Sequence, residues 1–126
     1  MPAKVLALVD DIFFLAKIQQ TAKQLGIAVE SVAPDAIQGR VASGGAGAIL
    51  LDLNHRSGKA IAVLQTLKND PATRAVPVVA FLSHVQADLA QSANAAGCDR
   101  VLARSAFSQQ LPQLLQELTK EENLHQ

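Results

Sequence analysis

The chain has 126 residues, the size of one ordinary domain, which leaves no room for a second globular unit. Apolar residues make up 49% of the sequence, enough to build a core, and this composition excludes an intrinsically disordered chain. The 11 basic and 11 acidic side chains balance, so the net charge attracts neither nucleic acid nor an anionic membrane. Aromatic residues amount to four Phe, which argues against stacking on nucleic-acid bases.

The sequence also indicates a compartment. A single cysteine, Cys98, cannot form an internal disulfide, which suits a reducing environment. Asp10 and Asp11 interrupt the first apolar run, so a signal peptide is not expected. No apolar run reaches the roughly 18 residues that a bilayer span needs. We therefore expect a cytoplasmic protein.

The first half of the chain begins with a strand, a helix and a second strand. Residues 4–9 form a continuous apolar run, which is typical of a strand buried on both faces. Residues 12–25 carry apolar side chains at helical spacing, and Gly26 follows as a stop signal. Residues 27–32 are the second expected strand.

A short helix and a third strand follow. The helix is expected at residues 34–43, with Pro34 at a tolerated position in its first turn. The next turn is expected at three glycines, namely Gly44, Gly45 and Gly47. Residues 48–51 are the third strand, and Asp52 comes directly after it.

The second half repeats the alternation. Residues 59–68 and 85–96 are expected as helices, and residues 76–82 and 100–103 as strands. Ser108 is a candidate cap for a last helix, with Pro112 near its start. The apolar face of that helix would consist of Leu111, Leu114, Leu115 and Leu118.

Five strands alternating with five helices predict one doubly wound α/β domain with a parallel sheet and helices on both faces. We expect this domain to span residues 1–120, followed by a polar tail at residues 121–126.

In such folds, ligands bind outside the carboxyl ends of the strands. The polar residues that follow the strands are Asp10 and Asp11, Asp52 and Asn54, Ser83, and Arg104. Because parallel strands end at the same edge, we expect these side chains to gather on one rim.

Clustered carboxylates repel one another unless a cation neutralises them. An all-oxygen site suits Mg²⁺, and Asp52 could supply an oxygen nucleophile of the kind that forms aspartyl phosphates. Ser83 could donate to a phosphoryl oxygen, and Arg104 could pair with Asp52 or with the phosphoryl group. A helix-capping role explains Asp11 equally well, because it precedes Ile12 at a helix start.

Four segments resemble the response-regulator receiver domain of two-component signalling, in its chemotaxis-regulator-like form. They are VLALVDD, AILLDLN, PVVAFLS and AAGCDRVLAR. The resemblance spans roughly residues 4–118 and implies a flavodoxin-like sheet of strand order 2-1-3-4-5. It further implies that Asp52 accepts phosphate, that Mg²⁺ is held by Asp10, Asp11, Asp52 and the carbonyl of Asn54, and that Ser83 is the switch hydroxyl.

The sequence departs from the family pattern around the acceptor. Arg104 stands where the family has lysine, and Val101 where it usually has Tyr or Phe. His84 follows the switch hydroxyl, where the family usually has a small residue. The loop after Asp52 keeps Gly58 but lacks the usual Met-Pro.

Large apolar residues at the start of the first helix suggest a docking surface. A helix buries one face, so we expect some of these side chains, Phe13 above all and Phe14 beside it, to remain exposed next to the acidic rim. In the family that the chain resembles, the kinase or phosphotransfer partner docks on this helix. Packing of Phe13 against the loop after the third strand is an equal alternative.

These features predict a stand-alone receiver that takes phosphate on Asp52 from a histidine kinase or phosphotransfer protein and signals through a downstream target protein. The alternative is a degenerate receiver that acts as a phosphorylation-independent adaptor. A cofactor-binding flavodoxin is rejected because acidic residues replace its phosphate-cradling loop. A hydrolase is disfavoured because no general base is apparent, so we expect no enzymatic activity beyond self-phosphorylation and dephosphorylation of Asp52.

Overall fold

The computed structural model describes residues 4–83 and 86–119. Its elements in chain order are β1 (Lys4–Leu8), α1 (Ile12–Gln24), β2 (Val29–Ser31), α2 (Pro34–Ala42), β3 (Ala46–Asp52), α3 (Ala60–Asn69), β4 (Val78–Leu82), α4 (Ala87–Ala95), β5 (Arg100–Ala103) and α5 (Arg104–Thr119). The alternation of strands and helices expected from the sequence is confirmed.

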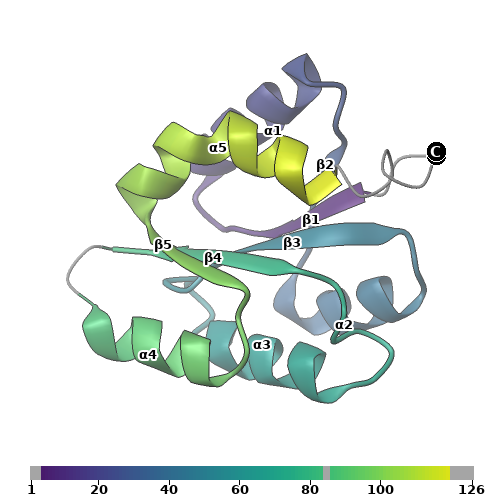
Figure 1. Cartoon of the computed structure of the whole chain (residues 1–126), viewed down its shortest axis with the longest axis vertical. Coiled ribbons are helices and arrows are strands. Elements are labelled where there is room, and N and C mark those ends of the chain that lie inside the picture. Colours follow the sequence, from purple (N-terminus) through teal and green to yellow (C-terminus); the bar gives the residue numbers. More distant parts are fainter. Residues whose placement is uncertain (1–3, 84–85, 120–126) are drawn as a thin grey trace.

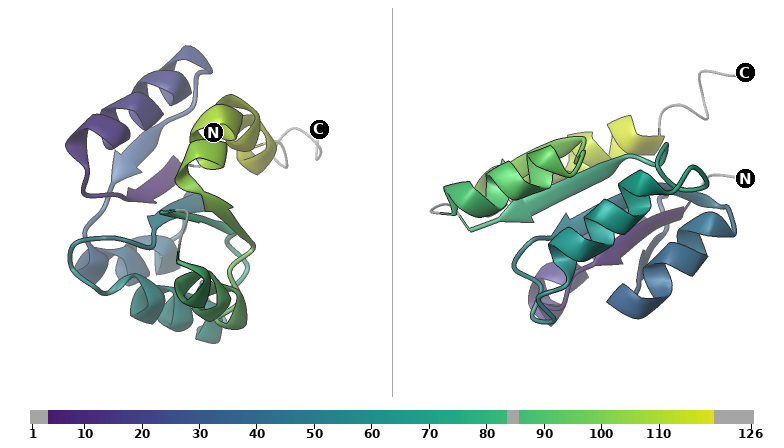
Figure 2. Two further views of the ribbon diagram at one scale, coloured as in Figure 1. Left: turned by 90° about the vertical axis from the view of Figure 1, so that its left-hand side faces the viewer. Right: turned by 90° about the horizontal axis from the view of Figure 1, so that it is seen from below.

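The strands form one parallel sheet with the order β2-β1-β3-β4-β5, which confirms the predicted topology. Helices α1 and α5 cover one face of this sheet, and α2, α3 and α4 cover the other (Figures 1 and 2). The sheet is therefore buried on both sides, which explains why its central strands are continuous apolar runs.

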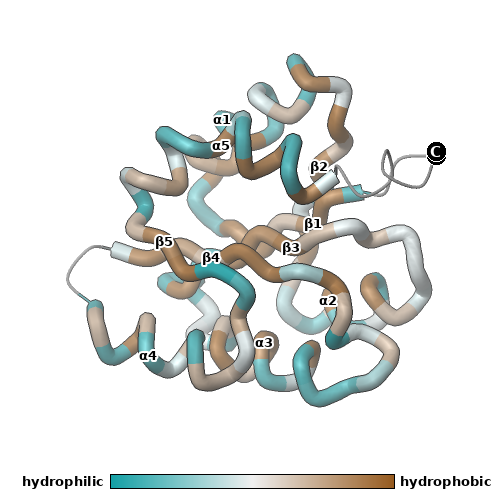
Figure 3. The backbone as a smooth tube through the Cα atoms, viewed as in Figure 1, coloured by the Kyte–Doolittle hydropathy of each residue, from teal (hydrophilic) through white to brown (hydrophobic). Residues whose placement is uncertain are grey.

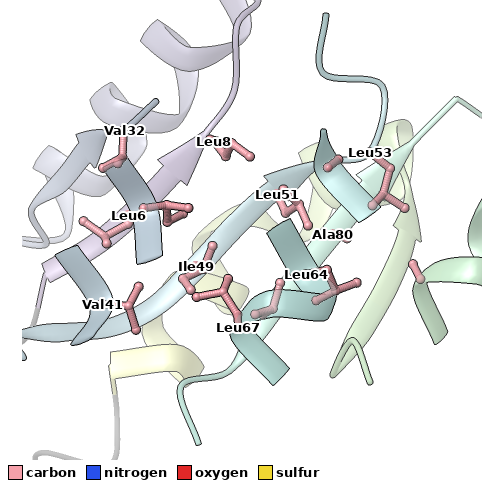
Figure 4. Close-up of a cluster of buried hydrophobic side chains, with 14 of the residues drawn as sticks. Leu6, Leu8, Val32, Val41, Ile49, Leu51, Leu53, Leu64, Leu67 and Ala80 are labelled. Carbon is pink, nitrogen blue, oxygen red and sulfur yellow. The ribbon is translucent and has the colours of Figure 1, made fainter. Parts of the chain in front are cut away.

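Each face of the sheet has its own core. Beneath α2, α3 and α4, apolar side chains of the strands meet those of the helices, among them Leu6, Ile49 and Leu64 (Figure 4). Beneath α1 and α5, Phe81 of β4 packs with Phe107 of α5. In Figure 3 the strands are mostly hydrophobic in colour and the helices carry the hydrophilic residues, as this three-layer packing requires.

Strands β2 and β3 differ most from the expected ranges, while β1 ends at Leu8 and β4 begins at Val78. Strand β2 keeps only Val29–Ser31, because it is an edge strand that pairs with β1 over three residues. Strand β3 starts earlier, at Ala46, so Gly47 belongs to the strand and not to the turn. The register with β1 shifts by one residue at this point, which makes Gly47 the extra residue of a bulge, a place where glycine is common.

The predicted start of the last helix is wrong. Helix α5 begins at Arg104, directly after β5, so Ser108 lies within the helix and is not its cap. Pro112 was expected near a start but is tolerated inside α5, where it is exposed. Burial of Phe107 stabilises the first turns, and this long-range contact outweighs the local signal that Pro112 gives.

Some expectations fall on residues that the structure does not describe. His84, the expected neighbour of the switch hydroxyl, and the polar tail at residues 121–126 lie outside the described residues. Among the helices of the described chain, none has the length and apolar character that crossing a membrane requires.

Candidate functional site

The carboxyl ends of the strands meet at the left edge of the sheet in Figure 1, and Asp52 lies at this edge as the last residue of β3. The side chain is unusual for a carboxylate because the residue is only 3% exposed. Its Oδ1 accepts the backbone N–H of Asn54 at 2.8 Å. Burial raises the pKa of Asp52, and the negative charge of Asp10 raises it further, although the Asn54 contact acts against this.

Asp11 uses both carboxylate oxygens in contacts within the chain. Its Oδ1 accepts the N–H groups of Phe13 at 3.0 Å and Phe14 at 3.1 Å, so it is the N-cap of α1. Its Oδ2 accepts a hydrogen bond from Nη2 of Arg104 at 2.7 Å. The Phe14 N–H, followed by the Arg104 guanidinium, lowers the pKa of Asp11.

Arg104 is held from a second direction by aromatic rings. Its guanidinium carbon lies 4.1 Å from the centroid of the Phe14 ring and 6.0 Å from that of Phe81. The Phe14, Phe81 and Phe107 rings pack with centroids 4.6–5.9 Å apart, and we call them the phenylalanine cluster. In this structure Arg104 pairs with Asp11 and not with Asp52, and its role toward a phosphoryl group remains a prediction.

Asp10 is engaged by the loop after β3. Its Oδ2 accepts the backbone N–H of Arg56 at 2.9 Å, and the Arg56 Nε lies 3.6 Å from the same oxygen. The Arg56 side chain is 91% exposed, so the backbone contact is the more constraining of the two. The loop that follows Asp52 is therefore tied to the end of β1.

Asn54 joins the ends of β3 and β4 through its side chain. Its Oδ1 accepts the N–H of Ser83 at 2.9 Å, and its Nδ2 donates to Oε1 of Gln86 at 2.6 Å. Sequence reasoning assigned a role to the Asn54 carbonyl and missed this bridge. An asparagine two positions after a strand-end carboxylate is a weak signal, because its partners Ser83 and Gln86 are distant in the sequence.

The structure brings the predicted rim residues to one edge but engages them in separate contacts. Asp10 accepts the N–H of Arg56, Asp11 accepts a hydrogen bond from Arg104, and Asp52 is buried with the N–H of Asn54 on its Oδ1. Within residues 4–83 and 86–119, no three carboxylate, histidine or cysteine side chains are grouped as a metal site. The metal-binding roles of these residues and the switch role of Ser83 remain predictions.

The two expected docking residues point in different directions. Phe13 is 83% exposed, and its neighbour Ile12 is 70% exposed. Phe14 is half-buried and belongs to the phenylalanine cluster, so it is less exposed than expected, and the docking role of both residues remains a prediction. One position of an α-helix turns the side chain by about 100°, which separates an outward Phe13 from an inward Phe14.

Two further residues, Val101 and Cys98, lie on the β5 side of the molecule. Val101, which stands where the resembled family usually has Tyr or Phe, lines a groove between α4 and β5 together with Ala87 and Ala90. Cys98 is half-buried, and burial raises the pKa of its thiol, which disfavours the reactive thiolate.

Comparison with solved structures finds receiver domains. The phosphorylated cyanobacterial phytochrome response regulator RcpA is 21% identical, with a TM-score of 0.74, 94% of this chain covered and 91% of that one. The magnesium-bound receiver domain of a sensor histidine kinase from Pseudomonas aeruginosa is 20% identical, with a TM-score of 0.79 and coverages of 95% and 99%. A receiver domain from Rhodospirillum rubrum is 23% identical, with a TM-score of 0.73 and coverages of 88% and 89%.

No family model and no curated protein matches the sequence. The similarity is therefore one of architecture, and it extends over nearly the whole chain and nearly the whole of each similar structure. Together with the strand order β2-β1-β3-β4-β5, it shows that this chain has the fold of the response-regulator receiver domains of two-component signalling.

Proposed function

We propose that the chain is a receiver that accepts a phosphoryl group on Asp52 and passes the signal on by protein–protein contact. The observation that carries this proposal is the buried carboxylate of Asp52 at the end of the central strand β3, at the edge where ligands bind in this class of fold. One similar protein was solved in a phosphorylated form, which supports the same chemistry here.

The geometry leaves one oxygen of Asp52 for bond formation. Oδ1 accepts the Asn54 N–H, and the described part of the chain places no hydrogen bond on Oδ2. In the reaction, a carboxylate oxygen attacks the phosphorus of the donor, and the bond from phosphorus to the donor's leaving atom breaks. The electron pair of that bond stays with the leaving group, which is the imidazole of a kinase or the acetate of acetyl phosphate. The product is an aspartyl phosphate.

The residues at the rim suit a divalent cation. The Asp10 and Asp52 carboxylates and the Asn54 carbonyl are hard oxygen ligands of the kind that Mg²⁺ takes. Burial, and to a smaller extent the charge of Asp10, raises the pKa of Asp52, and a cation held by these residues would favour the ionised carboxylates. When bound, the cation offsets negative charge on the phosphoryl oxygens. Asp11 would join these ligands by giving up its contact with Arg104.

The partner that delivers the phosphoryl group would dock on the start of α1. Ile12 and Phe13 are exposed there, directly after Asp10 and Asp11. Large exposed apolar side chains beside a reactive rim are typical of contact residues in protein interfaces. The partner proposed is a histidine kinase or a phosphotransfer protein.

Incubation with acetyl phosphate and Mg²⁺, followed by intact mass measurement, tests the acceptor. We expect a single phosphoryl adduct on the wild-type chain and none on Asp52→Asn. Asp88→Asn, which removes an exposed carboxylate on α4, serves as the control and is expected to be labelled like the wild type.

An adduct that persists in Asp52→Asn would show that another residue accepts the phosphoryl group. If the wild type forms no adduct with either a kinase donor or acetyl phosphate, the remaining interpretation is an adaptor that works without phosphorylation.

A further inference from the structure

The contact between Asp11 and Arg104 joins the rim to the opposite end of the chain, because Arg104 follows β5 and Asp11 follows β1. Asp11 accepts three hydrogen bonds, two from the start of α1 and one from the guanidinium. The Oδ2 atom that a cation would use is the one that Arg104 already holds at 2.7 Å. A guanidinium and a cation are both positive, so they cannot share this oxygen without strong repulsion.

The guanidinium is positioned before any ligand arrives. Arg104 is the first residue of α5, and its backbone is continuous with β5, which fixes the start of the side chain. The Phe14 ring, 4.1 Å from the guanidinium carbon, supports the other end through a cation–π contact. Since the side chain is ordered by two partners, little conformational entropy remains to be lost when it pairs with Asp11.

We propose that Arg104 competes with a divalent cation for Asp11, so that Arg104 lowers the affinity of the rim for the cation. This inference rests on the cation included in the proposed function, but it does not depend on phosphoryl transfer. Cation binding and the Asp11–Arg104 contact then exclude each other. When the cation binds Asp11, Arg104 leaves Oδ2 and its guanidinium shifts from the Phe14 ring.

The competition gives the phenylalanine cluster a second role. Because Phe14 contacts Arg104 as well as Phe81 and Phe107, movement of the guanidinium changes the surroundings of a ring that packs against the core under α1 and α5. Occupancy of the rim is thereby coupled to the packing of α1 against α5.

Arg104→Met tests the competition. Methionine keeps an unbranched stem over the Phe14 ring and favours helix, so the fold is expected to survive, while the charge and the hydrogen bond are lost. Mg²⁺ binding is measured by calorimetric titration of the full chain without any phosphoryl donor. We expect Arg104→Met to bind Mg²⁺ about fivefold to tenfold more tightly than the wild type, the range for loss of a partly exposed charge-assisted contact.

Arg56→Ala is the matched control, because it also removes one positive charge next to a carboxylate of the rim. The Arg56 side chain is 91% exposed, and its backbone N–H remains on Asp10 in the variant. We expect its Mg²⁺ affinity to change by less than about twofold, as is usual for an exposed ion pair. Asp10→Asn is expected to abolish tight Mg²⁺ binding both in the wild type and in Arg104→Met. This result would locate the cation at the rim.

The movement of Arg104 has a direct spectroscopic readout. In the wild type, the Arg104 side-chain protons lie above the Phe14 ring, and Mg²⁺ is expected to shift their NMR signals together with those of the Phe14 ring. If Arg104→Met and Arg56→Ala gain Mg²⁺ affinity equally, the gain follows from the lost positive charge alone, and the proposal is overturned. It is also overturned if Mg²⁺ binds with no shift at Arg104, or if none of the variants binds Mg²⁺.

These outcomes are separate from those of the phosphorylation assay. If Asp52 is phosphorylated but Arg104→Met binds Mg²⁺ no more tightly than the wild type, the proposed function is supported and the competition is contradicted. If Arg104→Met binds Mg²⁺ more tightly but no phosphoryl adduct forms on Asp52, the competition is supported and phosphoryl acceptance is contradicted.

Discussion

At the scale of single residues, Asp52 illustrates the conflict between stability and function. An ionised carboxylate that is buried in the sheet lacks most of its hydration, and one N–H from Asn54 compensates only in part. Such a group is kept where its chemistry is needed, since perturbed carboxylates are concentrated at functional sites. The residue therefore acts against the free energy of folding at neutral pH.

Asp52→Asn should consequently stabilise the fold at pH 7. Burial raises the pKa of Asp52, so the folded protein holds the proton more tightly than the unfolded chain does, and stability falls as pH rises from about 3.9 through the raised value. Asn does not ionise, so the variant does not lose stability in this pH range. Thermal unfolding is expected to give a Tm several degrees above that of the wild type at pH 7 and an equal Tm near pH 3.

Glu117→Gln, an exposed acid on α5, is the control and should leave Tm unchanged across the same pH range. A Tm for Asp52→Asn below that of the wild type at pH 7 would mean that the ionised carboxylate is stabilised by its surroundings, contrary to the burial argument.

At the scale of elements, helix α1 has two surfaces with opposite functions. Phe14 faces the sheet and α5 through the phenylalanine cluster, and Phe13 faces outward next to the rim. The Asp11 cap fixes the first turn, which sets the rotation of both side chains about the helix axis. The helix thus couples core packing to a proposed docking surface.

Phe107→Ala and Phe13→Ala should separate these two surfaces. Phe107 is fully buried, so its truncation is expected to cost roughly 3–5 kcal/mol of the free energy of unfolding. Phe13 is mostly exposed, and its truncation should change that free energy by less than about 0.5 kcal/mol. Urea denaturation measures both values.

If Phe13→Ala destabilised the fold by as much as Phe107→Ala, Phe13 would be a packing residue and its docking role would fall. A stable Phe13→Ala variant with reduced affinity for its phosphoryl donor protein is the result that supports docking.

At the scale of the whole molecule, the two edges of the sheet have different tasks. The carboxyl edge carries the rim, and the amino edge is tied together by Lys68. Its Nζ donates to the carbonyls of Arg74 and Val76 and to Oδ2 of Asp99, at 2.8–3.1 Å. Asp99 in turn accepts the N–H of Val78 at 2.7 Å, so one cluster joins α3 to the starts of β4 and β5.

Lys68→Met should therefore destabilise the fold without affecting the rim. The side chain is 11% exposed. Its loss removes the Nζ donor from the carbonyls of Arg74 and Val76 and leaves Asp99 with the N–H of Val78 alone, which is expected to cost about 2 kcal/mol. Lys59→Met is the control, because the Lys59–Asp35 pair is exposed and should contribute about 0.5 kcal/mol or less. Chemical denaturation of both variants, with Mg²⁺ titration of each, checks the prediction.

A loss of Mg²⁺ affinity in folded Lys68→Met would show that the two edges are energetically coupled. The Lys68 cluster would then not act on stability alone.

Local sequence patterns determined the order of the elements, the parallel sheet and the placement of Asp10, Asp11, Asp52, Ser83 and Arg104 at one edge. Continuous apolar runs and helical spacing are properties of neighbouring residues, so they are visible without the fold. They mark boundaries less well, as the bulge at Gly47 and the early start of α5 show.

Only the tertiary structure decided which side chains meet at that edge. Arg104 pairs with Asp11 across 93 positions of sequence, and Phe14 turns inward to rings from β4 and α5. Such contacts depend on the distance and direction of side chains on separate elements, which no local pattern contains. The acidic rim could thus be predicted from the sequence, whereas the guanidinium that occupies one of its carboxylates required the folded chain.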